Sequence, residues 1–356
     1  MCQRHDFNQQ KTKKMFVVPK SEITIGSVRF YGEQAGVNAV SIKESVDNIG
    51  NTATVTIPRN FQRKDGKGIL DYIHTGDKVT IRLGYGDNLY TEFEGYLAHI
   101  GDGTPVVLEI EDEWYLLRKT RFNKNFQSTT LKEVLQFVFP GYTIDDSVNS
   151  PIPEGFLIHD ASAYDVVKSL REQRGFFTRV DVEHKTVNCF YPFNFKGVET
   201  HTYIFGTRRC TLLDELRKKE MAPNIIKNTL KFVRKEDIKL HITAKGQDRT
   251  GKTITVELGD KSDDATKRTM NFGTECQTKQ ALRERAQAAL DKQCFDGYEG
   301  KITGFGVPRV HAGDAVKLID PDNPEREGTY LVKAVKITYG VTTGFRRECE
   351  LSYKIN

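Results

Sequence analysis

The sequence contains few of the residue patterns that support chemistry. Its six cysteines include no Cys-x-x-Cys pair, and its eight histidines include no His-Glu-x-x-His motif, so no zinc site is predicted. No Gly-x-Ser-x-Gly elbow marks a serine nucleophile. Acidic pairs such as Asp145 and Asp146 fall in predicted turns, where carboxylates are ordinary solvated charges. We therefore assign no catalytic, cofactor-binding or metal-binding residue, and we expect a protein that is not an enzyme.

Long apolar runs are also absent. No segment approaches the length needed to span a membrane, and the first twenty residues, although basic, lack the apolar core of a signal peptide. The dispersed cysteines are expected to be reduced thiols, so we expect the protein in a cytoplasm. Residues 1–14 precede the first strand-like segment and are predicted to be a flexible extension.

An excess of one charge sign is missing as well. The 53 Lys and Arg residues face 48 Asp and Glu, a formal net charge of +5 with the two signs interleaved along the chain. A dedicated nucleic-acid binder would cluster its cations on one face or in one tail. With 356 residues the chain is long for a single core, so two or three domains are expected.

The segment at residues 74–112 predicts three antiparallel strands. Apolar and polar residues alternate in it with a period of two, and glycine-rich turns separate its three parts. In the second part Phe93 belongs to the apolar face, while Glu92 and Glu94 are predicted to point to the opposite, solvated face. Such a unit is typical of one edge of a β-barrel or sandwich.

A second segment near the C-terminus repeats this pattern. The matched landmarks are His74 with His311, Gly95 with Gly328, and Ile110 with Leu351, at offsets of 237, 233 and 241 residues. Offsets that agree this closely predict a duplicated β unit. The alternative is that an all-β chain reuses Gly-Asp, which is common turn chemistry, without any duplication.

Between and within these units the pattern changes to helix. Thr130 and Glu133 form a capping box ahead of an apolar stripe at helical spacing, and a later helix is predicted to start at Thr278. We predict a mainly β (α+β) fold with two related antiparallel β-barrel domains. The expected parts are a first barrel at 15–122, a small α/β domain at 123–196, and a second barrel at 197–356 that carries an inserted hairpin and helix at about 236–297.

Residues 246–253 match the formula of a phosphate-binding loop, Gly-x-x-x-x-Gly-Lys-Thr. That loop works because a helix follows it and points its N-terminal amides at the phosphates. Here Ile254 and Val256 alternate with polar residues, which predicts a strand. A hairpin turn is therefore predicted, and a nucleotide hydrolase is the alternative.

With these elements in order, the chain resembles phage tail baseplate hub proteins of the late-control-protein-D type, a fold family that also supplies the N-terminal part of type VI secretion spike proteins. The resemblance rests on residues 76–86, 93–96, 129–135 and 164–167, and it extends from about Met15 to Asn356. No lysozyme-like segment and no C-terminal β-helix repeat is present, so a spike or cell-wall hydrolase would be another chain.

The resemblance implies a structural role. Members form a homotrimeric ring between the tail tube protein and the spike protein, with two related barrels per chain, so six similar barrels match a sixfold tube on one side and a threefold spike on the other. The lumen would pass the tape-measure protein or DNA, and the protein would assemble in the bacterial cytoplasm before joining the tail or injection particle. A cell-wall hydrolase and a carbohydrate-binding β module remain alternatives to this hub.

Overall fold

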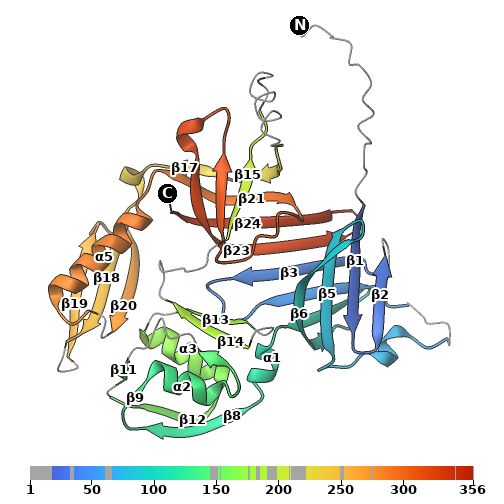
Figure 1. The fold of residues 1–356 in the computed structure, drawn as a ribbon, viewed down its shortest axis with the longest axis horizontal. Helices are drawn as coiled ribbons and strands as arrows, with labels where there is room; N and C mark the ends of the chain where they lie inside the picture. The colour runs from blue at the N-terminus through green and yellow to red at the C-terminus, as the bar shows by residue number, and fades with distance from the viewer. Residues whose placement is uncertain are drawn as a thin grey trace.

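A computed structural model describes most of the chain. The described residues are 18–32, 36–60, 66–144, 151–152, 154–174, 177–181, 185–190, 199–207, 209, 222–248, 252–273, 276–340 and 342–355. The predicted extension at 1–14 lies outside them. The fold is mostly β, with one large sheet, a small helix-containing part and a projecting insertion (Figure 1).

Fourteen strands make up the large sheet. They are β1 (Pro19–Ile25), β2 (Val28–Gly32), β3 (Ala39–Ser45), β4 (Thr52–Ile57), β5 (Lys78–Tyr85), β6 (Asn88–Ile100), β7 (Val106–Glu111), β15 (Thr200–Ile204), β16 (Ile225–Asn228), β17 (Lys231–Val233), β21 (Gly297–Phe305), β22 (Ala315–Ile319), β23 (Gly328–Gly340) and β24 (Gly344–Lys354). The main path is β16-β21-β24-β23-β3-β4-β7-β6-β5-β1-β2. Every strand pairing in the fourteen-stranded sheet is antiparallel except that of β15 with β22, which lie off this path.

The sheet divides into two halves with one strand order. In the first half, β1-β5-β6-β7-β4-β3 lie side by side, and in the second half the order is β15-β22-β23-β24-β21-β16. The chain also visits corresponding strands in the same sequence. The outermost strands differ, because β1 is antiparallel to β5 whereas β15 is parallel to β22.

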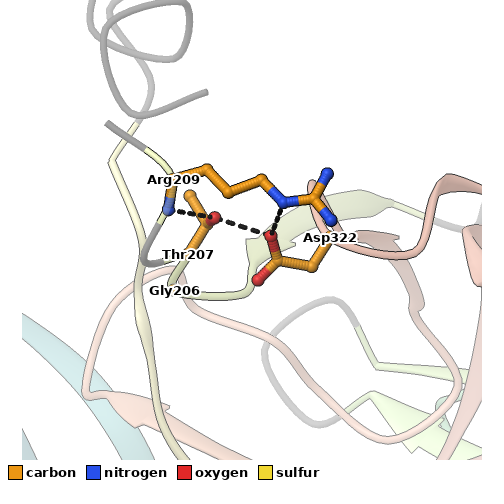
Figure 2. Close-up of a pocket in the computed structure, with 4 residues that line it drawn as sticks. All are labelled: Gly206, Thr207, Arg209 and Asp322. Carbon is orange, nitrogen blue, oxygen red and sulfur yellow. Dashed lines mark hydrogen bonds and ion pairs between the residues drawn. The ribbon is translucent and has the colours of Figure 1, made fainter. Parts of the chain in front are cut away.

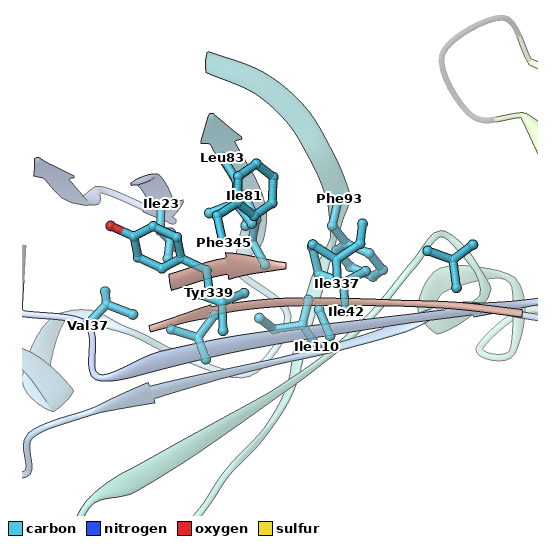
Figure 3. Close-up of a cluster of buried hydrophobic side chains, with 14 of the residues drawn as sticks. Ile23, Val37, Ile42, Ile81, Leu83, Phe93, Ile110, Ile337, Tyr339 and Phe345 are labelled. Carbon is cyan, nitrogen blue, oxygen red and sulfur yellow. The ribbon is translucent and has the colours of Figure 1, made fainter. Parts of the chain in front are cut away.

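The two halves meet where β3 pairs with β23. This pairing runs from Ser45 opposite Ala334 to Ala39 opposite Gly340. We call the contact between the halves the seam. Because β-strand side chains alternate between faces, the apolar residues of both halves point into one continuous core, as Ile42, Phe93 and Ile337 do in Figure 3.

A second core belongs to the α/β part. Its elements are α1 (Trp114–Leu117), β8 (Arg121–Phe126), β9 (Thr129–Thr130), α2 (Leu131–Val138), β10 (Thr143–Ile144), β11 (Pro151–Ile152), β12 (Phe156–Ser162), α3 (Ala163–Arg174), β13 (Phe177–Asp181) and β14 (Thr186–Phe190). The Trp114 ring packs edge-on against Phe139 and Tyr164 inside this core. The domain boundaries given above stay predictions.

The predicted capping box of α2 is confirmed. The Glu133 amide donates to Thr130 Oγ1 at 3.3 Å, and the Thr130 amide donates to Glu133 Oε2 at 3.1 Å. Thr129 adds its hydroxyl, which donates to the same carboxylate oxygen at 2.6 Å. The four apolar residues of the predicted stripe are buried, because residues three and four apart share a helix face.

The insertion forms a third, smaller core. It contains β18 (Leu240–Gln247), β19 (Thr253–Gly259), β20 (Thr266–Gly273) and α5 (Lys279–Gln293), and it projects from the second half at the left of Figure 1. Thr278 caps α5 as predicted, because its hydroxyl accepts a hydrogen bond from the Ala281 amide at 3.2 Å. Leu282 and Ala286 pack on the sheet. Short 3-10 helices lie at Ile69–Tyr72, Lys235–Asp237 and Pro324–Arg326.

One predicted strand face is wrong. Glu92 was expected on the solvated face with Glu94, yet it is only 5% exposed. The cause is a β-bulge in β6, where the pairing steps from Phe93 opposite Ile81 to Thr91 opposite Arg82 and leaves Glu92 as the extra residue. A bulge shifts the alternation by one position, so Glu92 turns inward.

Candidate functional site

A surface hollow of about 600 Å³ opens beside the end of β15. Gly206, Thr207, Arg209 and Asp322 line it (Figure 2). Asp322 is satisfied within the hollow, because Thr207 Oγ1 donates to its Oδ1 at 2.8 Å and the Arg209 Nε lies 3.4 Å from the same oxygen. Among the described residues of the lining, the Asp322 carboxylate is therefore already paired with a hydroxyl and a guanidinium.

Reactive groups elsewhere in the described residues are few. No three His, Cys, Asp or Glu side chains in that part of the chain gather closely enough to hold a metal ion. Burial raises the pKa of the Cys349 thiol to about 12, so this cysteine is not a reactive thiolate. The described part also contains no helix that is long and apolar enough to cross a membrane.

The segment that matches the phosphate-binding formula joins two strands. β18 ends at Gln247 and β19 begins at Thr253, with these two residues paired in antiparallel register. The Asp248 amide donates to the Lys252 carbonyl at 3.0 Å, and the Lys252 amide donates back to Asp248 Oδ1 at 2.9 Å. A strand therefore follows the segment, as predicted, and no helix N-terminus is available there to receive a phosphate.

The first of the two repeated turns is tied by four hydrogen bonds. The His74 amide donates to Asp77 Oδ2 at 2.8 Å, and the Asp77 amide donates to the His74 carbonyl at 3.1 Å. The Gly76 amide donates to the Leu97 carbonyl at 2.7 Å, and the Leu97 amide donates to the Asp77 carbonyl at 2.9 Å. Gly76 has a φ of 94°, a left-handed conformation that suits glycine.

The second turn makes the same four bonds. The His311 amide donates to Asp314 Oδ2 at 2.7 Å, and the Asp314 amide donates to the His311 carbonyl at 3.1 Å. Gly313, with a φ of 96°, donates to the Val332 carbonyl at 2.9 Å, and Val332 donates to the Asp314 carbonyl at 2.8 Å. The repeated sequence motif is thus one turn structure built twice.

These bonds fix which residues correspond between the halves. Leu97 corresponds to Val332, because each exchanges the same two backbone hydrogen bonds with its turn. Leu97 lies opposite Ile110, and Val332 lies opposite Leu351, so the predicted match of Ile110 with Leu351 agrees with the strand register.

The predicted match of Gly95 with Gly328 is wrong by two residues. Counting back from Leu97 and Val332 places Tyr330 at the position of Gly95. Gly95 is needed because a Cβ there would lie 2.1 Å from the Glu111 carbonyl oxygen. Each glycine avoids a different steric clash, so the two glycines do not occupy equivalent positions in the two halves.

Buried charges concentrate at the seam. Arg347 and Glu92, both with fully buried side chains, form an ion pair of 2.7 Å between the second and the first half. Arg347 also donates to the Gly306 and Val310 carbonyls, at 3.1 and 2.7 Å, and Arg309 Nε reaches the other Glu92 oxygen at 3.1 Å. The network ties the strands of one half to the loop before β22 in the other.

A second ionisable pair lies beside it. His311 Nδ1 is 3.2 Å from both carboxylate oxygens of Glu44, and the Ala312 amide donates to Glu44 Oε2 at 3.2 Å. Burial alone would raise the pKa of Glu44, but the hydrogen bond and charge of His311, with the charge of Arg347, lower it. Burial opposes protonation of His311, yet Glu44 outweighs this and raises its pKa, so the pair is held in its charged form.

One feature of the sequence could have predicted this network, namely an arginine on the apolar face of the last predicted strand. Arg347 lies in phase with Phe345 and Cys349, on the face of β24 that points inward. A charge on the buried face of a strand requires a partner of opposite sign. The partner itself, Glu92, stands 255 residues earlier in the chain, and nothing in the local pattern identifies it.

The fold matches those of solved tail proteins. A tail protein from Neisseria meningitidis MC58 has a TM-score of 0.61 and 11% sequence identity, with 94% of this chain and 96% of that chain covered. The 43 kDa tail protein of prophage MuSo2 from Shewanella oneidensis has a TM-score of 0.59 and 14% identity, with coverage of 93% and 97%. These proteins share the fold of this chain over nearly its full length.

A type VI secretion component has the same fold. The E. coli c3393 protein, described as structurally similar to T4 bacteriophage tail proteins, has a TM-score of 0.50 and 10% identity, with 93% of this chain and 76% of that chain covered. No curated protein matches the sequence. One family model, the Alg8 N-terminal domain, matches residues 22–320, which is more than half of the chain. The chain therefore belongs to the Alg8 N-terminal domain family.

Proposed function

We propose that this protein is the structural hub of a phage tail or a tail-like injection machine, of the late-control-protein-D type. The observation that carries the proposal is the duplicated architecture: two halves with one strand order and one turn structure, joined head to tail through the seam. The fold shared with tail and type VI secretion proteins supports it.

Each half is proposed to be a β-barrel. Asn224 supports closure of the second half, because it bridges the outer strand β15 to the start of β16. Its amide donates to the Ile204 carbonyl at 3.2 Å, its side-chain oxygen accepts from the Ile204 amide at 2.8 Å, and its Nδ2 donates to the Thr202 carbonyl at 3.0 Å. Closure leaves fewer open strand edges, which otherwise invite aggregation.

Three chains would close into a ring with six similar barrels. A heterologous contact closes into a ring when its rotation divides a full turn, and alternation of two unlike halves gives threefold symmetry with a sixfold appearance. Such a ring would fit a sixfold tail tube on one face and a threefold spike on the other. The lumen would pass a tape-measure protein or DNA, and assembly would take place in the bacterial cytoplasm before incorporation into the tail or particle.

Joining a tube to a spike requires no catalysed reaction, so we propose that the protein is not an enzyme. The buried ion pairs of the seam serve to fix one half against the other. Light scattering on the purified protein, alone and mixed with its tube protein, tests the hub directly. A trimer, or a trimer that forms on the tube, is expected. A protein that stays monomeric at high concentration and does not bind the tube protein would contradict the proposed trimeric ring.

A further inference from the structure

The seam is a heterologous contact, made by two different surfaces. The first half contributes the outer edge of β3, with Glu44 on it. The second half contributes the C-terminal part of β23 and the His311 turn. Because the halves are built alike, each half also carries the other half's kind of surface. Among the described residues of the chain, no strand pairs with either of those two corresponding surfaces.

On the second half, the strand that corresponds to β3 is the broken strand β16–β17. β3 pairs with β4 through Val40 opposite Val55, and β16 pairs with β21 through Asn228 opposite Ile302, which are matching pairs in the two halves. The same correspondence places Phe232 of β17 at the position of Glu44. It therefore identifies residues 227–233 as the counterpart of the edge that the seam covers.

This counterpart edge is unusually open. β3 alternates between buried and exposed residues, whereas every residue from Ile226 to Thr229 is exposed. Ile226 is 46% exposed and Phe232 is 38% exposed, while Glu44 at the corresponding position in the seam is 9% exposed. Phe232 is a large apolar side chain on a strand edge that is covered in the other half, which indicates a missing partner, and Ile226 lies directly before that edge.

On the first half, the counterpart of the β23 edge and the His311 turn is the end of β6 with the His74 turn, and it is also open. His74 and Thr75 of the turn are exposed. On its β5 side, β6 is last paired at Tyr96 with Lys78, so the edge from Ala98 to Ile100 has no strand beside it among the described residues. In the seam, the matching carbonyl of Lys333 accepts the Val46 amide at 3.0 Å.

We propose that a second copy of this chain docks its His74 turn and the end of β6 against the β16–β17 edge of its neighbour. The contact repeats the seam between chains and rests on the proposed hub function. It places Phe232 of one copy against His74 of the next and Val233 opposite His99. The pairing is shorter than in the seam, because β6 ends at Ile100 whereas β23 continues to Gly340.

The chemistry of this contact differs from that of the seam. Where the seam has the charged pair of Glu44 and His311, the contact between chains has Phe232 and His74. It is therefore expected to depend on apolar burial and to lack the ion pair that a carboxylate forms with a protonated histidine in the seam. Because of this difference, the proposed position of Phe232 against His74 can be tested by substituting these two residues.

The test is to convert the proposed contact into a copy of the seam. Phe232→Glu introduces the carboxylate that Glu44 supplies there. Self-association is measured by light scattering over a concentration series at several pH values. The wild-type protein should show no gain in association at the acidic end of the pH series. The variant should associate more weakly than the wild type at the alkaline end and regain about two- to fivefold in association constant at the acidic end, the worth of an exposed ion pair.

Three controls isolate the pair. Phe232→Gln should weaken association without the regain at low pH, and His74→Ala in the Phe232→Glu background should abolish the regain. Leu157→Glu, at a 69% exposed apolar residue of β12, should leave association unchanged. Arg326 lies over the Phe232 ring and would attract the introduced carboxylate, but an arginine stays charged over the whole pH series, so it does not produce a regain at low pH.

The outcomes separate this contact from the hub itself. If the wild type forms a trimer and Phe232→Glu leaves association unchanged at every pH, the proposed surface is wrong while the ring stands. A regain that persists after His74→Ala would also overturn the pairing of these two residues. A wild type that stays monomeric alone and with its tube protein would overturn both proposals.

Discussion

At the scale of single residues, the most consequential feature is a charge placed in an apolar core. Arg347 is fully buried and is held by Glu92 and by two carbonyls. Replacing Arg347 with Met would leave the Glu92 carboxylate buried with only its partly exposed partner Arg309. We expect Arg347→Met to lower the free energy of unfolding by about 3–5 kcal/mol, the cost of an uncompensated buried charge. Urea denaturation followed by far-UV circular dichroism, which reports on the strands of the large sheet, measures it.

The matched control for Arg347→Met removes both charges. In the double variant Arg347→Met, Glu92→Met no buried charge is left without a partner, so much of the lost stability should return. A double variant as unstable as the single one would mean that lost packing, and not the unpaired carboxylate, dominates the effect.

The second pair predicts a pH dependence. The folded-state pKa of His311 is raised, so the pair's stabilisation is fully present below the ordinary value of 6.5 and is lost as the pH rises through the folded-state pKa. The difference in unfolding free energy between the wild type and His311→Gln should therefore shrink as the pH rises above 6.5. Denaturant melts across this range measure it. A difference that grows with pH would contradict the assignment.

At the scale of single elements, local sequence chemistry predicted well. The capping box of α2, the start of α5 at Thr278, the alternating strands and the turn at residues 246–253 depend on neighbours within a few positions, which the sequence displays directly. Glycine identity was less informative, because Gly95 and Gly328 each answer a local steric demand and are offset by two positions between the halves. The bulge at Glu92 left no local signal, because the bulged residue is an ordinary glutamate.

The cap of α2 gives a second stability prediction. Thr130→Ala removes the hydroxyl that accepts from the Glu133 amide, and an orphaned amide at a helix N-terminus costs about 1 kcal/mol. Denaturant melts should show this loss. Thr130→Ser, which keeps the hydroxyl, is the control and should retain most of the stability. An unchanged stability in Thr130→Ala would mean that Thr129 alone suffices to anchor Glu133.

The hairpin between β18 and β19 gives a prediction about ligand binding. Because a strand and not a helix follows Lys252, we expect no nucleotide binding. Calorimetry with ATP and Mg²⁺ should give no saturable heat for the wild type or for Lys252→Ala. Micromolar binding that disappears in Lys252→Ala would revive the nucleotide hydrolase.

At the scale of the whole molecule, the sequence predicted a mainly β chain with a repeat but not the seam. The pairing of β3 with β23 joins residues almost 300 positions apart, and no turn or periodicity encodes it. It is selected by burial, because it covers the β3 edge and joins the apolar faces of both halves into one core. A strand edge covered within the chain in one half and open in the other is therefore visible only in the folded molecule.

The same comparison of halves leads to the last prediction. Two halves with one strand order should appear as similar lobes when three chains close into a ring. Averaged electron micrographs of the assembled hub, viewed along the ring axis, should show six lobes of nearly equal size. The insertion with β18–β20 and α5 belongs only to the second half, so it should mark every second lobe with extra density and reduce the symmetry to threefold. A variant that lacks residues 236–296 should show weaker alternation with six lobes retained, and the α/β part, which also occurs once per chain, should keep the symmetry threefold. A ring with a number of lobes other than six, with or without the insertion, would contradict the duplicated-barrel hub.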